Sequence, residues 1–96
     1  MSAFGEVRVK HNAAESRYEA VVQGLLCVAE YEVVDGLMIF THTFVPLKLR
    51  GRGLAEKLVR VALTDARAKG LKVTPTCSYV ARFIDRHAEY RDLVAP

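Results

Sequence analysis

The first half of the chain alternates between short apolar runs rich in β-branched residues and brief polar breaks. Runs of this kind, bounded by turn residues, predict β-strands. We expect strands at residues 7–10, 18–22, 25–34 and 37–45. Asp35-Gly36 between the last two runs is a strong hairpin signal, because both central residues of a type I′ turn need positive φ, and Gln23-Gly24 is a weaker one. This half therefore predicts an antiparallel meander of about four strands.

The pattern changes to a helical period after Gly51. Apolar residues recur three and four positions apart, and Gly70 suits the left-handed position that ends a helix. A short strand at 71–74 and a second amphipathic helix at 78–87, with Ser78 as its N-cap, follow. A long helix between two strands is a crossover, so the fifth strand should lie parallel to the fourth. We predict an α+β fold and a single domain at residues 1–96.

The composition, 51% hydrophobic and 26% charged, is that of a soluble globular domain. The longest apolar runs are far below the roughly 18 residues that span a bilayer, and residues 1–10 lack the apolar core of a secretory signal. The two cysteines, Cys27 and Cys77, form no C-x-x-C pair, which argues against a disulfide scaffold or a zinc site. We expect a cytoplasmic protein with free thiols, no metal and no membrane contact.

Charge is divided unevenly along the chain. Residues 1–45 include 3 basic and 6 acidic residues, whereas residues 46–96 include 11 basic and 5 acidic ones, so the two parts carry −3 and +6. The basic second half favours an anionic partner, either a nucleic acid or a phosphorylated small molecule. The basic residues gather around one turn without interleaved aromatic residues, which disfavours nucleic acid.

The segment that leads into the long helix has the properties of an anion site. Here a strand end passes through a basic turn with two glycines, and unpaired amides and the positive end of the helix dipole meet at the helix N-terminus. The segment is not a Walker loop, and Glu56 stands where the dinucleotide fingerprint needs its third glycine. The segment runs from Val45 at the end of the expected strand to Ala55 in the first turn of the helix, and Arg50 and Arg52 add positive charge to it.

Arg50, Gly53 and Ala55 match the R-x-x-G-x-A form of the signature Q/R-x-x-G-x-G/A. With this motif the chain resembles the GNAT superfamily of N-acetyltransferases, and the resemblance implies that the turn holds the pyrophosphate of acetyl-coenzyme A. The cofactor-binding residues that it implies are Phe44, Val45, Arg50, Gly51, Arg52, Gly53, Leu54 and Ala55. The chain looks most like the small single-domain subfamily, over about residues 18–93. The segments that carry this likeness are Thr41-His42-Thr43, Pro75-Thr76-Cys77-Ser78-Tyr79-Val80 and Arg86-His87-Ala88-Glu89-Tyr90.

The chain departs from these relatives in three ways. Phe44 stands where many members of the subfamily carry an acidic residue, and Ala88 replaces the usual proline. Compared with ordinary members of the superfamily, the chain also lacks sequence for the paired helices after the first strand and for the last two strands. Those parts usually shape the acceptor pocket, so the coenzyme half of the site is well specified and the acceptor half is nearly absent.

Cys77 is the candidate nucleophile. It ends the fifth expected strand and precedes a helix, where the dipole and nearby arginines should lower the pKa of its thiol. A thiolate can attack a thioester and hold the acetyl group until an amine takes it. The resemblance implies the same role, because the matching cysteine is the proposed nucleophile of the small subfamily. The alternative is an inert core thiol.

His42 and Tyr79 are the other candidate catalytic residues. His42 can act as a base for the thiol or for the incoming ammonium, or it can simply be a half-buried, hydrogen-bonded histidine. The resemblance implies that Tyr79 donates a proton to the leaving coenzyme thiolate, whereas the apolar residues after it favour simple packing. We expect no catalytic role for His11, in a polar turn, or for His87, at a helix end.

The sequence thus leads to an acetyl-CoA-dependent N-acetyltransferase with an amine acceptor. Two mechanisms remain open, transfer through Cys77 and direct attack of the amine on the thioester. The alternative function is a module that binds coenzyme A or an acyl-CoA without transferring anything. The identity of the acceptor and the oligomeric state stay open.

Overall fold

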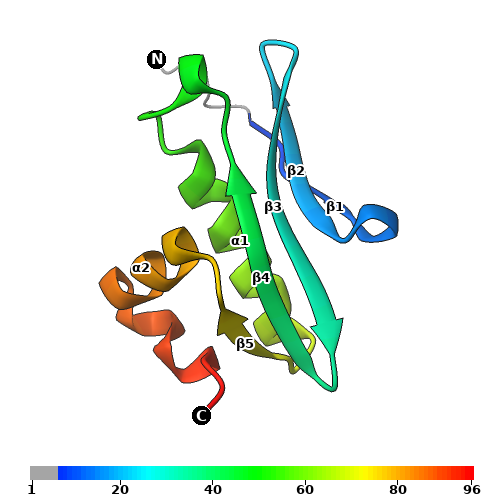
Figure 1. Ribbon diagram of the computed structural model, residues 1–96, viewed down its shortest axis with the longest axis vertical. Helices are drawn as coiled ribbons and strands as arrows, with labels where there is room; N and C mark the ends of the chain where they lie inside the picture. The colour runs from blue at the N-terminus through cyan, green and yellow to red at the C-terminus, as the bar shows by residue number, and fades with distance from the viewer. Residues whose placement is uncertain (1–6) are drawn as a thin grey trace.

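The computed structural model describes residues 7–96, which form a five-stranded sheet in the order β1-β2-β3-β4-β5 with two α-helices (Figure 1). Strands β1 to β4 are antiparallel, and β5 lies parallel to β4. The predicted α+β fold with a parallel fifth strand is therefore confirmed. The elements are β1 (Lys10–Asn12), η1 (Ala13–Glu15), β2 (Arg17–Val22), β3 (Leu25–Val34), β4 (Leu37–Phe44), η2 (Leu47–Leu49), α1 (Leu54–Ala68), β5 (Lys72–Pro75), α2 (Ser78–Arg86) and η3 (Ala88–Leu93), where η is a 3₁₀-helix.

Both hairpin turns have the backbone that the sequence predicts. Gln23 and Gly24 have φ of 52° and 77°, and Asp35 and Gly36 have φ of 50° and 77°. Two consecutive positive values match the twist of the flanking strands, which is why asparagine, aspartate and glycine dominate such turns. Gln23 adopts the same positive φ although glutamine is not one of the residues that favour it.

Three local expectations were wrong. The first strand begins at Lys10 rather than at residue 7, because its pairing with β2 starts at Lys10 opposite Glu19. The N-cap of α2 is Cys77, not Ser78, which is the first residue of the helix. His11 lies in β1 rather than in a polar turn. The C-terminal tail, which the sequence left undetermined, forms η3 and adds a parallel bridge from Val94 to the outer edge of β5.

Both α-helices contribute to one hydrophobic core on one face of the sheet. Helix α1 packs mainly on β2 and β3, and α2 packs on β4 and β5, so the two helices lie side by side (Figure 1). Leu58, Val59 and Leu63 of α1 and Val80 of α2 are fully buried in this core together with Phe40 of β4. No helix of the described chain covers the opposite face of the sheet.

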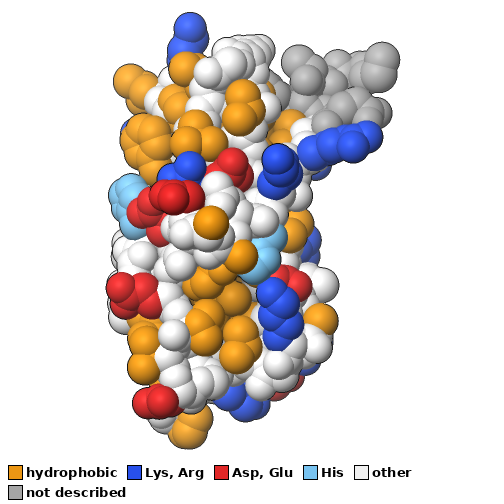
Figure 2. Space-filling view, turned by 90° about the vertical axis from the view of Figure 1, so that its right-hand side faces the viewer, with side chains coloured by type: hydrophobic (Ala, Val, Ile, Leu, Met, Phe, Trp, Pro, Cys, Tyr) orange, Lys and Arg blue, Asp and Glu red, His pale blue; other side chains and the backbone are white. Residues whose placement is uncertain are grey.

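A polar cluster attaches β1 to the C-terminal half of α1. The imidazole of His11 stacks on Tyr18 with ring centroids 4.3 Å apart and hydrogen-bonds the hydroxyl of Tyr31. The Tyr18 hydroxyl donates to Asp65, which also pairs with Lys69 at 3.0 Å. Figure 2 shows this side of the molecule, where histidine and charged side chains lie between groups of hydrophobic ones. The contacts of His11 with Tyr18 and Tyr31 hold β1 against the neighbouring strands.

Candidate functional site

A cavity of about 380 Å³ lies where β4 and β5 part. The two strands pair only as far as Phe40 opposite Pro75, after which the Thr76 hydroxyl and the Cys77 amide both bond the carbonyl of Phe40. Beyond this point the edge of β4 that faced β5 has no neighbouring strand from residues 7–96, as Figure 1 shows. The cavity is lined by Thr43, Phe44, Val45, Leu49, Arg50, Gly51, Gly53, Leu54, Ala55, Glu56 and Tyr79.

The turn into α1 leaves backbone amides open to this cavity. Gly53 is the N-cap, and it offers no side chain to cap the helix. The first intrahelical bond runs from the Lys57 amide to the Gly53 carbonyl, at 3.1 Å, so the amides of Leu54, Ala55 and Glu56 precede it. Gly53 has φ of 78°, a left-handed conformation that residues with a Cβ rarely adopt. Free amides at the positive end of a 15-residue helix favour the approach of an anion.

Seven of the eight residues expected to bind the cofactor line the cavity, and Arg52 does not. Arg50 supports the turn: its Nε donates to the Val45 carbonyl at 2.7 Å, and its guanidinium carbon is 5.9 Å from the centroid of the Phe44 ring. Arg50 thus fixes the end of β4 against the turn and also leaves positive charge at the cavity wall.

Strand β4 carries a β-bulge in the middle of the site. Tyr31 of β3 pairs with Phe40 and Glu30 pairs with His42, so Thr41 is an extra residue between them. Side chains alternate along a strand, and one inserted residue reverses the alternation for all residues that follow. Phe40, before the bulge, faces the helices and is fully buried.

The bulge places Thr43, rather than His42, on the helix side of the sheet. Thr43 pairs with Ala29, which is fully buried beneath the helices, and its hydroxyl lies 3.7 Å from the sulfur of Cys77. His42 and Phe44 lie on the opposite face, where their rings stack at 6.3 Å and Phe44 is 43% exposed. The contact with Cys77 therefore comes from Thr43, and His42 faces the side of the sheet without helices.

Cys77 is held in a nest of hydrogen-bond donors. Burial raises the pKa of its thiol, but hydrogen bonds from the Val80 amide, the Thr43 hydroxyl and the amides of Tyr79 and Thr43 together outweigh burial, so the net shift is downward. The sequence predicted this direction. The cause differs in part, because helix amides and Thr43 lower the pKa and arginine side chains do not contribute. Cys27, in contrast, is fully buried and burial raises its pKa.

Tyr79 lies at the edge of the core and lines the cavity, unlike the fully buried Val80 beside it. Burial and the nearby carboxylate of Glu56 raise the pKa of Tyr79, with Arg86 opposing them, so the hydroxyl stays protonated near neutral pH. The sequence did not single out Thr43, Leu49 or Glu56 as lining residues. Thr43 belongs to the His-Thr segment, but only the bulge shows which of its side chains meets the cavity.

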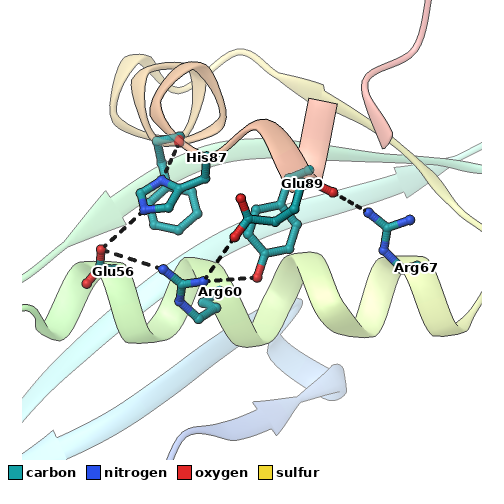
Figure 3. Close-up of polar contacts among 7 residues, drawn as sticks. Glu56, Arg60, Arg67, His87 and Glu89 are labelled. Atoms are coloured by element: carbon teal, nitrogen blue, oxygen red, sulfur yellow. Dashed lines mark hydrogen bonds and ion pairs between the residues drawn. The ribbon is translucent and has the colours of Figure 1, made fainter. Parts of the chain in front are cut away.

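The wall between α1 and the C-terminal elements is held by a polar network, shown in Figure 3. Arg60 of α1 contacts Glu56 at 3.8 Å and Glu89 at 3.7 Å, and it donates to the Tyr90 hydroxyl at 3.3 Å. The Nδ1 of His87 donates to the Phe83 carbonyl at 2.7 Å, and its Nε2 lies 3.6 Å from Glu56. His87 is thus the C-cap of α2 with a structural role in this network.

A sequence profile described as the GCN5-related N-acetyl-transferase family matches residues 17–93. The chain belongs to the GCN5-related N-acetyltransferase family. Protein NATD1 of Mus musculus is 31% identical over 83 residues, which cover 83% of this chain and 76% of that protein. Protein NATD1 of Xenopus tropicalis is 29% identical over 87 residues, which cover 88% of this chain and 80% of that protein.

The fold of this family member also matches a solved structure. The solution structure of a GCN5-like protein from Staphylococcus aureus superimposes with a TM-score of 0.74 and 23% identity, over 95% of this chain and 90% of that one. In residues 7–96, no His, Cys, Asp and Glu side chains group in a way that would hold a metal ion. Neither α-helix is long and apolar enough to cross a membrane.

Proposed function

We propose that this member of the GCN5-related N-acetyltransferase family transfers an acetyl group from acetyl-coenzyme A to an amine. The observation that carries the proposal is the cavity between β4 and β5, which joins the free amides of α1 to the Thr43–Cys77 contact. The pyrophosphate of the acyl donor would lie against the amides of Leu54 and Ala55 beside Arg50. The acyl end would then point along the open edge of β4 toward Thr43.

Cys77 supplies the nucleophile in the first of two possible mechanisms. Its sulfur attacks the carbonyl carbon of the thioester, the bond from that carbon to the donor's sulfur breaks, and the acetyl group stays on Cys77. The donors around the thiol keep a larger fraction of it ionised at neutral pH than in a free cysteine.

Tyr79 and His42 would carry the two protons of the reaction on opposite sides of β4. Tyr79 stays protonated and lines the cavity, so it can donate to the departing sulfur. His42 faces the sheet side without helices, where it can take the proton of an amine that approaches acetyl-Cys77 from there. The attacking amine forms the amide bond and restores the Cys77 thiolate.

Direct transfer is the other mechanism, and one observation favours it. Cys77 is not among the lining residues, although its sulfur lies 3.7 Å from the hydroxyl of Thr43, which is one of them. In direct transfer the open edge of β4 near Val45 polarises the thioester carbonyl while the amine attacks it.

Incubation with acetyl-CoA in the absence of an amine separates the two mechanisms. We expect intact-mass analysis to show one added acetyl group, and peptide mapping to place it on Cys77. Cys27 is an internal control, because it is fully buried and should stay unmodified. If Cys77 stays unmodified while the enzyme turns over with an amine, transfer is direct.

The second candidate function is a module that binds coenzyme A without transferring an acetyl group. It is favoured by the sheet face around His42, which no helix of residues 7–96 covers to enclose an acceptor. A thermal shift with coenzyme A, acetyl-CoA and ATP tests donor binding, and a broad amine panel then tests turnover. Stabilisation by coenzyme A without any acetylated product would favour the module.

A further inference from the structure

A second cavity continues from the donor site along the groove between α1 and α2. It has a volume of about 250 Å³ and shares Glu56 and Tyr79 with the first cavity. Its other lining residues come from α2 and its C-cap: Arg82, Phe83, Arg86 and His87. A ligand whose pyrophosphate sits on the N-terminus of α1 therefore has a path along this groove.

The groove presents two arginines that the rest of the described chain leaves without partners. Arg82 and Arg86 are exposed, four residues apart on one face of α2, and neither forms a hydrogen bond or an ion pair within residues 7–96. Other arginines nearby are engaged. Arg60 contacts Glu56 and Glu89, Arg67 pairs with Asp92 at 2.8 Å, and Arg91 donates to the Asp85 carbonyl.

Glu56, the one carboxylate that lines both cavities, is contacted by two basic side chains. It lies 3.8 Å from Arg60 and 3.6 Å from His87 (Figure 3). Its remaining lone pairs suit a hydroxyl or amino donor, such as those of a nucleoside. The groove thus offers two free guanidinium groups beside a hydrogen-bond acceptor, a combination suited to a phosphorylated nucleoside.

We propose that Arg82 and Arg86 bind the 3′-phosphate of the nucleotide end of coenzyme A. This inference rests on the proposed function, because it places the pyrophosphate at the turn of α1. A coenzyme A molecule has two anionic groups at that end, the pyrophosphate and the phosphate on the ribose. With the first at the amides of Leu54 and Ala55, the adjoining groove places the second beside α2.

The test is calorimetric titration of the full chain with coenzyme A and with 3′-dephospho-coenzyme A. We expect the dephospho form to bind about tenfold more weakly, as for loss of a charge-assisted contact. Arg82→Gln and Arg86→Gln keep good helix formers at exposed positions, so the fold is retained. Each should weaken coenzyme A by about tenfold and leave the dephospho form within about twofold. Lys10→Ala, on β1 and outside both cavities, removes the same charge and should change neither affinity.

Failure of this inference differs from failure of the proposed function. If the wild type binds both ligands equally, or if the glutamine variants weaken both ligands alike, the arginines do not select the 3′-phosphate, although the donor site stands. If neither ligand binds at millimolar concentration, both the donor site and the α2 subsite are wrong.

Discussion

Near the C-terminal end of α1, Asp65 accepts a hydrogen bond from Tyr18 and pairs with Lys69, whereas at the N-terminal end the amides of Leu54 and Ala55 have no acceptor among residues 7–96. Polar groups are thus hydrogen-bonded at one end of the helix and lack a partner among these residues at the other. A donor or acceptor that is buried without a partner costs free energy, so unpaired groups in a folded protein lie where water or a ligand can bond to them. The paired end stabilises the fold, and the open end is available for chemistry.

Cys77→Ser should have the largest effect on function. We expect turnover to fall by roughly 10²-fold or more, because the hydroxyl of serine is a far weaker nucleophile at neutral pH. Coenzyme A affinity and thermal stability should stay unchanged, since the cysteine does not line the cavity. Ser78→Ala, at the next position, is the matched control and should retain turnover. An unchanged rate in Cys77→Ser would exclude the covalent route.

Asp65→Ala should lower the free energy of unfolding by about 1–3 kcal/mol, because it leaves the buried Tyr18 hydroxyl without its acceptor. Coenzyme A affinity should not change, as Asp65 lies at the other end of α1. Urea unfolding and calorimetric titration measure the two quantities. Asp85→Ala removes a carboxylate without an ion pair in residues 7–96 and should cost less than about 0.5 kcal/mol. A loss of affinity in Asp65→Ala would show that the two ends are coupled.

The pH dependence of stability gives a second test of the paired end of α1, through the titration of Asp65. The hydrogen bond from Tyr18, against the opposing effect of burial and helped by Lys69, lowers the pKa of Asp65 below its usual 3.8. A lowered folded-state pKa stabilises the protein above the unfolded value, and this contribution is lost as the pH falls through the folded value. The stability difference between wild type and Asp65→Asn should therefore be full at neutral pH and shrink below about pH 4.

Gly53→Ala and Gly24→Ala form a matched pair with nearly the same backbone. Their φ values are 78° and 77°, and a Cβ added at either position meets no atom within 4 Å. Each substitution should destabilise the protein by about 1 kcal/mol through left-handed strain alone. Only Gly53→Ala should also weaken coenzyme A binding, by several-fold, because in the proposed donor site its methyl group would lie where the phosphate oxygens approach. Equal affinities for the two variants would argue against an anion at this turn.

The parts of the fold that could be predicted from sequence are those set by neighbouring residues. Asp35-Gly36 determines its own turn, and the spacing of apolar residues along α1 determines its buried face. The anion turn was found for the same reason, because its glycines and the helix start are adjacent in sequence. Its residues line the cavity with the exception of Arg52.

The parts that sequence could not give depend on contacts between distant segments. The bulge at Thr41 arises from the register between β3 and β4, and a one-residue shift exchanges the faces of His42 and Thr43. The parting of β4 and β5 depends on two bonds to the Phe40 carbonyl. Likewise, Arg60 and Arg67 pair with residues of η3, which is distant from α1 in sequence. The positions of the arginines along the chain therefore do not show which of them find a partner and which, like Arg82 and Arg86, have none within residues 7–96.

Thr43→Val should have the smallest effect, and it tests whether the donors around Cys77 set its reactivity. The Thr43 hydroxyl favours the thiolate, so removing it should raise the thiol pKa and move the pH midpoint of iodoacetamide alkylation upward. At fixed neutral pH the alkylation rate should then fall. Thr43→Ser keeps the hydroxyl and should restore the midpoint, whereas Thr41→Val, at the bulge, should not move it. If Thr43→Val alkylates with the wild-type midpoint, the amides of Val80, Tyr79 and Thr43 hold the thiolate without the hydroxyl, and the N-terminal end of α2 sets the reactivity of Cys77.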